Sequence, residues 1–285
     1  MSLYQKSQLL SNISAFKLDS RIGRAVLSVV GTGKTMGEWV SPKPGHSPVI
    51  LDYRYYRPGD PVKDIDWKLS ARTEKVFIKI REGFRQTDFL IAIDGSGSMK
   101  TTYTDSGTSK FIGALTLAYI IGKFALRSRD RIFILWEGEK IRVDNEQVLI
   151  DTLVHIEFQP PGVDESFWQG SIAASNLFVL SDFFIQPEKS RDYISRLAHD
   201  AENMFVLIIQ DKNERSFNFS GRYEFIDPES NKKLLAESKD IKAEYIDLYK
   251  KHFSEISKQC KSYGIRIGKA MSTEDPLNAF IKAVS

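Results

Sequence analysis

Apolar positions along most of the chain fall into short runs that alternate with amphipathic stretches. These runs predict strands at 76–82, 88–94, 131–138, 140–145, 176–182, 204–210 and 265–270, of which 88–94 and 176–182 are expected to be buried. Helical spacing of apolar residues predicts helices at 111–129, 145–156, 187–201, 241–264 and 275–285. A tight turn is expected at Gly138 and a hairpin at 222–237. Strands that alternate with helices are typical of a mainly parallel sheet with helices on both faces, so the sequence predicts an α/β fold.

The first 75 residues have a different pattern. Leu9, Leu10, Ile13 and Phe16 lie close to helical spacing, which predicts a short helix. From residue 25 to about residue 61, glycines and prolines interrupt short β-like pieces, a pattern of loops and strands. We therefore divide the chain into an N-terminal helix and β-rich extension, residues 1–75, and an α/β domain, residues 76–285.

The composition excludes several classes of protein. The chain has 285 residues, of which 42% are hydrophobic and 27% are charged, and this balance argues against disorder, collagen and coiled coil. Its 40 Lys and Arg residues nearly balance its 37 Asp and Glu residues, so no bulk attraction to nucleic acid is expected. A single cysteine, Cys260, cannot form an internal disulfide. With no apolar stretch of membrane-spanning length and no secretory leader, we expect a cytoplasmic protein without a membrane span or a nucleic-acid partner.

A candidate cation site follows the predicted strand at 88–94. The strand ends in Asp94 and continues as Gly-Ser-Gly-Ser, so that Asp94, Ser96 and Ser98 form a D-x-S-x-S pattern. The carboxyl ends of parallel strands open into the crevice where ligands bind. We expect the two glycines to allow a tight turn that brings the three oxygens together. A carboxylate with two hydroxyls suits a hard cation such as Mg²⁺, whereas the alternative is a plain turn that caps the next helix.

A second carboxylate lies at the end of another predicted strand. Ser181 and Asp182 directly follow the apolar run at 177–180. An Asp at such a place is commonly a helix cap or turn residue. Two strands of one sheet that both end in Asp favour a shared site, and we predict that Asp182 joins Asp94 there.

These residues resemble the metal-ion-dependent adhesion site of von Willebrand factor A domains. The resemblance implies a von Willebrand A-like, Rossmann-like fold in which Ser96 and Ser98 bind Mg²⁺ or Mn²⁺ through their hydroxyls. Asp94 and Asp182 would bind the cation directly or through water. An Asp or Glu of a partner protein would complete the coordination.

The same family supplies a Thr from a further loop. The corresponding segment here is PGVDES at 161–166, where Val163 stands in place of the Thr and Asp164 follows it. The resemblance therefore implies that Asp164 is a replacement ligand or that water fills the position.

A second signature lies upstream, in RYYRPGDPVKDIDWKLSAR at 54–72. It resembles the bacterial family known as domain of unknown function 58, which carries R-x-Y-x-x-G-D and I-D-W-x-x-S-A-R ahead of a von Willebrand A-like domain. The arginines and aspartates of this signature can form bidentate pairs that clamp the extension onto the α/β body. They are Arg54, Asp60, Asp66 and Arg72. Trp67 would bury apolar area in the same joint, and we expect a structural role for the whole signature.

The favoured interpretation is a non-enzymatic adaptor that recognises an acidic side chain of a partner protein through a bound Mg²⁺. Resemblance to the family further implies that it acts with a MoxR-type AAA+ ATPase. Two alternatives stay open, a Mg²⁺-dependent hydrolase or phosphotransferase that uses the same carboxylates, and a scaffold that has lost metal binding. An enzyme needs a base or nucleophile beside the metal, and no His, Lys or Cys lies close to Asp94 in the sequence. Cys260 lies in an apolar helix face and is expected in the core.

Overall fold

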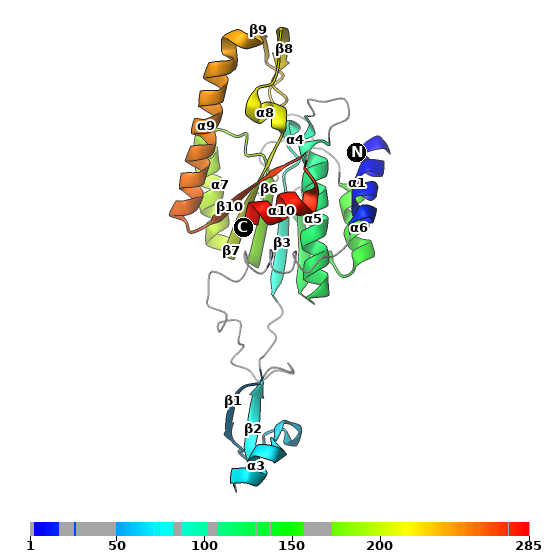
Figure 1. Cartoon of the computed structure of the whole chain (residues 1–285), viewed down its shortest axis with the longest axis vertical. Helices are drawn as coiled ribbons and strands as arrows, with labels where there is room; N and C mark the ends of the chain where they lie inside the picture. The colour runs from blue at the N-terminus through cyan, green and yellow to red at the C-terminus, as the bar shows by residue number, and fades with distance from the viewer. Residues whose placement is uncertain are drawn as a thin grey trace. The chain divides into compact units, whose positions relative to one another are not determined.

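The chain forms two compact units in the computed structural model (Figure 1). Residues 3–16, 26, 50–73, 75–81, 87–101, 108–128, 130–136, 138–156, 173–272 and 274–284 are described. The larger unit combines Met1–Val30 with Thr87–Ser285, and the small unit is Gly31–Gln86. This division differs from the expected boundary after residue 75, because the N-terminal helix joins the larger unit and the strand expected at 76–82 joins the small one.

A six-stranded sheet forms the centre of the larger unit, in the order β10-β7-β6-β3-β4-β5. Its strands are β3 (Asp88–Ile93), β4 (Arg131–Trp136), β5 (Glu139–Val143), β6 (Ala174–Ser181), β7 (Ala201–Gln210) and β10 (Arg266–Met271). All neighbours pair in parallel except β4 and β5, which form an antiparallel edge around Gly138. The strand order changes direction between β3 and β6, and open α/β sheets bind ligands at such a point.

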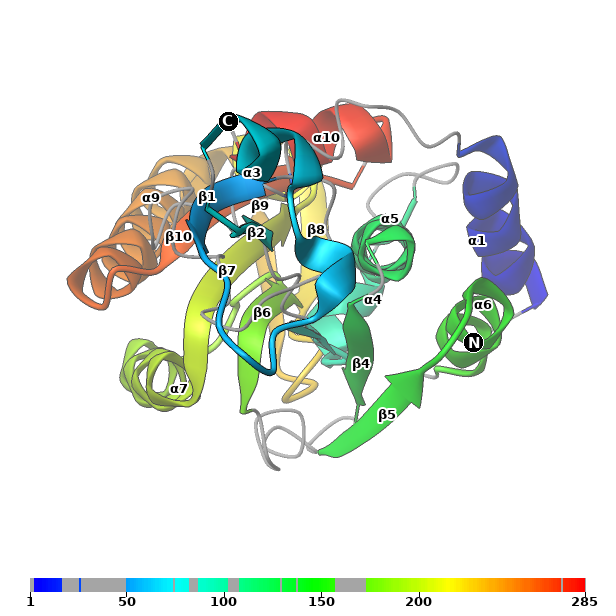
Figure 2. The ribbon, with the colours of Figure 1, turned by 90° about the horizontal axis from the view of Figure 1, so that it is seen from below.

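Helices cover both faces of this sheet, as Figure 2 shows. One face carries α5 (Lys110–Arg127) and α10 (Pro276–Val284), and the other carries α7 (Pro187–Asp200) and α9 (Ser238–Ser262). In β3, Leu90 and Ala92 belong to the core beneath α7 and α9. Phe89 lies on the opposite face of the sheet, where it stacks on Phe178 of β6. Because both faces are covered, the strands are apolar at consecutive positions rather than at alternate ones.

The long helix α5 is buried almost all round because other helices cover its outer side. These helices are α6 (Glu146–His155) and α1 (Leu3–Ala15), with α10 beside them. Leu9 and Ile13 of α1 are buried, and Asn12 donates a hydrogen bond to Thr116 of α5. The N-terminal helix is therefore a cover of the α/β core and not part of the β-rich segment.

A hairpin rises at the end of the sheet where α4 (Gly97–Lys100) and α8 (Lys212–Ser216) lie (Figure 1). Its strands are β8 (Arg222–Ile226) and β9 (Lys233–Glu237), which confirms the expected hairpin. The hairpin leads directly into α9. This helix is closed by Gly264, as expected, because Gly264 has a φ of 68° and the Ile265 N–H donates to the Cys260 carbonyl at 2.8 Å.

The small unit pairs β1 (Ile50–Tyr55) with β2 (Phe77–Arg81) in an antiparallel ladder, with a short 3₁₀ turn (Val62–Asp64) and α3 (Trp67–Thr73) between them. The expectation that 76–82 belongs to the α/β sheet was wrong. This strand pairs with β1 in an antiparallel ladder instead, and the rings of Tyr55 and Phe77 lie against each other with centroids 4.8 Å apart.

The signature at 54–72 organises this small unit from within. Arg54 and Asp60 form a bidentate pair, with N–O distances of 2.8 and 2.7 Å. Asp66 accepts hydrogen bonds from the N–H groups of Lys68 and Leu69, which begin α3, and it lies 3.4 Å from Lys79.

Two other members of the signature lie on α3. Trp67 is 65% exposed on the small unit, while Ser70 of the next turn faces β2 and accepts a hydrogen bond from Phe77 N–H. Arg72 is in the last turn of the helix, and it is exposed. A clamp onto the larger unit stays a prediction.

The predicted fold class is confirmed as α/β, with a mainly parallel sheet between two helical layers and an N-terminal helix. The strand order is consistent with a Rossmann-like or von Willebrand A-like arrangement. None of the described helices is long and apolar enough to cross a membrane.

Candidate metal centre

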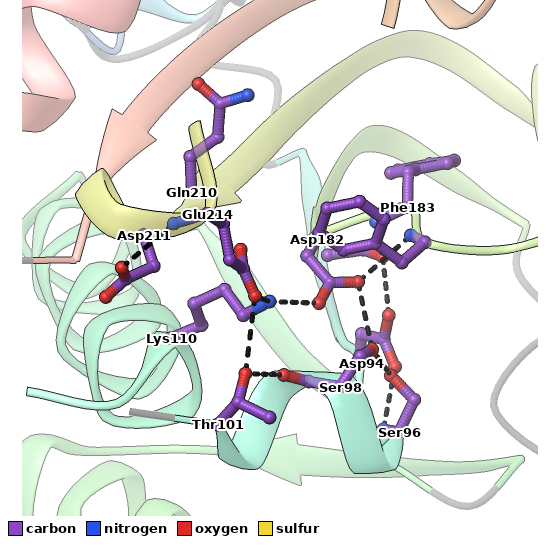
Figure 3. A network of polar contacts seen from close by, with 12 residues as sticks. Asp94, Ser96, Ser98, Thr101, Lys110, Asp182, Phe183, Gln210, Asp211 and Glu214 are labelled. Carbon is purple, nitrogen blue, oxygen red and sulfur yellow. Dashed lines mark hydrogen bonds and ion pairs between the residues drawn. The ribbon is translucent and has the colours of Figure 1, made fainter. Parts of the chain in front are cut away.

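The two predicted carboxylates come together at the point where the strand order changes direction. Asp94 follows the last residue of β3, and Asp182 follows the last residue of β6, which is the parallel neighbour of β3. The Asp94 N–H donates to the carbonyl of Leu180 at 2.9 Å, so the ladder continues to the first site residue. Figure 3 shows both carboxylates beside the hydroxyls of Ser96 and Ser98.

Asp94 is held on both of its oxygens. Oδ1 accepts from the Ser96 N–H at 2.8 Å, and Oδ2 accepts from the Ser181 hydroxyl at 2.5 Å. Burial, together with the negative charge of Asp182, raises the pKa of Asp94 to about 6. Burial and the neighbouring carboxylate therefore disfavour the charged form of Asp94, a condition that a bound cation would relieve.

Two spacings among three side-chain oxygens are compatible with adjacent positions around an octahedral cation. The Ser96 and Ser98 hydroxyl oxygens are 3.1 Å apart, and the Ser98 hydroxyl lies 3.2 Å from Asp182 Oδ1. Oxygens at adjacent positions around Mg²⁺ are separated by about 3.0 Å when each lies at about 2.1 Å from the metal. Hydroxyl and carboxylate oxygens are also the ligand types that Mg²⁺ and Mn²⁺ prefer. Ser96, Ser98 and Asp182 thus fit such a cation.

A buried ammonium group, which sequence reasoning missed, lies on the other side of Asp182. Lys110 is fully buried at the first turn of α5, and its Nζ lies 2.8 Å from Asp182 Oδ2 and 2.5 Å from Glu214 Oε1. The Phe184 ring also faces the ammonium, at 4.9 Å. Burial by itself would lower the pKa of Lys110, but the two carboxylates more than offset this and raise the pKa above its ordinary value. Lys110 is therefore a permanent cation of the site.

The residues around Asp182 are held by the backbone that follows β6. Phe183 is buried with a φ of 54°, a conformation that side chains other than glycine rarely adopt. Its N–H donates to the Ser181 hydroxyl at 2.9 Å, and the N–H of Phe184 donates to Asp182 Oδ1 at 3.1 Å. This turn fixes the direction in which the Asp182 carboxylate points.

The glycines of the D-x-S-x-S loop are needed for space rather than for a tight turn. Neither has a positive φ. A Cβ on Gly95 would lie 2.2 Å from the ring of Trp136, and a Cβ on Gly97 would lie 2.7 Å from the carbonyl oxygen of Pro228. The expected reason for the glycines was therefore wrong, since close approach of Trp136 and of the β8–β9 hairpin requires them.

One predicted ligand cannot be placed. Asp164 lies outside the described residues, as does Val163, which stands where the family has a Thr, so the part played by this loop stays a prediction. Within the described ranges no group of three or more His, Cys, Asp or Glu side chains could hold a metal, and the candidate centre depends on hydroxyls beside its carboxylates. Cys260 is buried in the core, where burial raises the pKa of its thiol to about 12.

Comparison with known proteins gives one family. Residues 52–148 match the family described as "Protein of unknown function DUF58". The matched DUF58 segment contains the signature at 54–72, the D-x-S-x-S loop and Lys110, and it supports the resemblance found in the sequence. No curated protein matches. Among solved structures, conserved hypothetical protein BatB from Bacteroides thetaiotaomicron aligns with 69% of this chain and 96% of its own, at 12% identity and a TM-score of 0.38.

Proposed function

We propose that the chain is a non-enzymatic, metal-dependent protein-binding adaptor. The observation that carries the proposal is the spacing of three oxygens, on Ser96, Ser98 and Asp182, which matches adjacent positions around Mg²⁺ or Mn²⁺. Their place at the change of strand direction is where open α/β sheets bind ligands. When bound, the cation would offer an open position to the carboxylate of an Asp or Glu of a partner protein.

The residues of the chain have separate parts in this proposal. Ser96 and Ser98 supply neutral oxygens, so the cation keeps enough charge to attract a further carboxylate. Asp94 holds the loop through the Ser96 N–H and contributes charge directly or through water. Lys110 holds the second oxygen of Asp182, which leaves Oδ1 directed toward Ser98.

The positions of the titratable groups favour an adaptor over an enzyme. Hydrolysis or phosphoryl transfer needs a free base or nucleophile beside the metal. Lys110 is held by two carboxylates, and both oxygens of Asp94 accept hydrogen bonds. We therefore place the Mg²⁺-dependent hydrolase or phosphotransferase second, and the metal-free scaffold remains an outcome of the test below.

We further propose a MoxR-type AAA+ ATPase as the partner that acts with this chain. The family resemblance supports this context, and the DUF58 match over 52–148 agrees with the family. Co-purification of the tagged chain with such an ATPase in the presence and absence of Mg²⁺ tests the association. Failure of the two proteins to associate under both conditions would refute it.

Calorimetric titration with Mg²⁺ and Mn²⁺ tests the metal site. We expect binding by the parent chain and loss of binding in the double variant Asp94→Ala, Ser96→Ala. Thr101→Val is the control next to the loop, because the Thr101 hydroxyl donates to the Ser98 carbonyl at 2.7 Å and lies 3.4 Å from Glu214 Oε1, and neither acceptor is one of the proposed ligand oxygens. Unchanged binding in the double variant would remove this site, and no binding by the parent would favour the scaffold. Metal-dependent turnover of p-nitrophenyl phosphate would favour the enzyme.

A further inference from the structure

The turn of the β8–β9 hairpin lies directly on the loop of the candidate metal centre. Glu229 accepts a hydrogen bond from the Ser98 N–H at 2.7 Å, although the two residues are 131 positions apart. The carbonyl oxygen of Pro228 occupies the space that a side chain at position 97 would need. Ser98 therefore offers its hydroxyl to the candidate metal centre and its N–H to a carboxylate from another part of the chain.

The turn is built to hold Glu229 in this position. Asp227 accepts hydrogen bonds from the Glu229 N–H at 3.0 Å and from the hydroxyl of Ser230. The Asn231 N–H closes the turn on the Asp227 carbonyl at 2.8 Å, with Asn231 at a φ of 55°. The hydrogen bond from Ser230 is the main cause of a lowered pKa at Asp227, so this carboxylate stays ionised and keeps the turn together.

The base of the hairpin is held by aromatic packing and by a backbone hydrogen bond. Phe217 packs on Phe225 of β8 and on Tyr245 of α9, with ring centroids 5.8 and 4.7 Å apart. The Ser238 N–H, at the start of α9, donates to the Gly221 carbonyl at 2.9 Å. The position of Glu229 thus follows from packed side chains at one end of the hairpin and an ordered turn at the other.

Glu229 also has no cationic partner in the described part of the chain. The ion pairs in that part of the chain involve other carboxylates, and the half-buried Glu229 accepts its hydrogen bond there from the Ser98 N–H. Glu229 is thus a half-buried carboxylate without a cationic partner, and it binds the N–H of Ser98, whose hydroxyl belongs to the candidate metal centre. This arrangement points to Glu229 as a ligand of a cation bound there.

We propose that Glu229 is a built-in acidic ligand that occupies the position intended for the partner's Asp or Glu. This inference rests on the proposed function, because it assumes a cation at Ser96, Ser98 and Asp182. The hairpin turn then acts as a cover, and a partner must displace Glu229 to reach the cation. Recognition would accordingly favour a partner that supplies a carboxylate and also holds the hairpin away.

Relaxation of water protons by bound Mn²⁺ tests whether Glu229 covers the metal, because the relaxation rate reports the number of exchangeable waters on the ion. In Glu229→Ala we expect about one more exchangeable water per bound Mn²⁺ than in the parent. Gly97→Ala should give the same gain without removing any acid, since its methyl group would push Pro228 and the turn off the loop. Glu224→Ala is the matched control on the same hairpin, where an exposed ion pair with Lys233 is lost, and its water count should equal that of the parent.

The outcomes separate this inference from the proposed function. If the parent binds no Mn²⁺, the proposed function fails and the inference falls with it. If Mn²⁺ binds and the water count of Glu229→Ala equals that of the parent, the inference alone is refuted. A gain in both Glu229→Ala and Gly97→Ala, with melting temperatures that show folded proteins, supports it. A gain in Glu224→Ala of the same size would overturn it, because loosening of the hairpin would then explain the result.

Discussion

Removal of the buried ammonium should destabilise the larger unit more than any other single charge change in it. Lys110→Met keeps a similar length and volume but leaves Asp182 and Glu214 without the cation that lies 2.8 and 2.5 Å from them. Breaking a buried ion pair by removing one partner costs about 3–5 kcal/mol of the free energy of unfolding. For a unit of this size that corresponds to a fall of roughly 6–20 °C in melting temperature.

The pH dependence of this loss follows from the charges that remain. In the parent, the raised pKa of Lys110 means that its stabilisation is present through neutral pH and is lost only as the pH rises above the ordinary value of 10.5. In Lys110→Met, Glu214 stays buried beside Asp182 without the ammonium that lowers its pKa, so its pKa, already raised by burial, should rise further. The variant should therefore lose stability as the pH rises through the pKa of Glu214, and its deficit against the parent should be smaller near pH 5 than at pH 8.

Thermal melting followed by circular dichroism at both pH values checks these expectations. Lys123→Met is the matched control on the same helix, since its pair with Glu146 at 2.8 Å is partly exposed. That pair should contribute at most about 1 kcal/mol. The reasoning is refuted if Lys110→Met melts within 2 °C of the parent at pH 8, or if its deficit is the same at pH 5, as for a simple loss of packing.

Two further predictions concern the loop itself. The pKa of Asp94 is raised to about 6, and its charged form is the one that favours a cation. Mg²⁺ affinity measured by calorimetry should therefore fall by about tenfold for each pH unit below 6. A flat affinity profile between pH 5 and 8 would contradict this role of Asp94. Gly95→Ala places a methyl group against Trp136 and should lower the free energy of unfolding by about 1–3 kcal/mol in denaturant titration, whereas an unchanged midpoint would show that the ring moves aside freely.

Much of the fold follows from local patterns. Strands buried on both faces must be apolar at consecutive positions, and for this reason β3, β6 and β7 are visible in the sequence. The partner of a strand is not a local property. The run at 76–82 has alternating residues that suit either a sheet edge or a hairpin, and only the proximity of β1 in space makes β2 part of the small unit.

The candidate site divides in the same way. Asp94 and Asp182 were predictable because each directly follows its own apolar strand, and parallel neighbours bring their carboxyl ends together. Lys110 was not predictable, because a lysine before an apolar helix has the same pattern as a solvated residue of the first turn. Its charge is compensated by Glu214, which lies on α8, the short helix that follows β7. Glu229 lies on a polar hairpin turn whose sequence gives no sign of the loop beneath it.

The α/β class, the strand ends that carry the two aspartates and the hydroxyls between them can be inferred from local sequence, since each depends on neighbours within a few residues. The charges that meet those residues come from distant parts of the chain and depend on the tertiary fold. Hydrogen bonds and ion pairs act over about 3 Å and are indifferent to separation along the chain. The order of strands in the sheet and the packing of the hairpin therefore decide that Lys110 compensates Asp182 and that Glu229 binds Ser98.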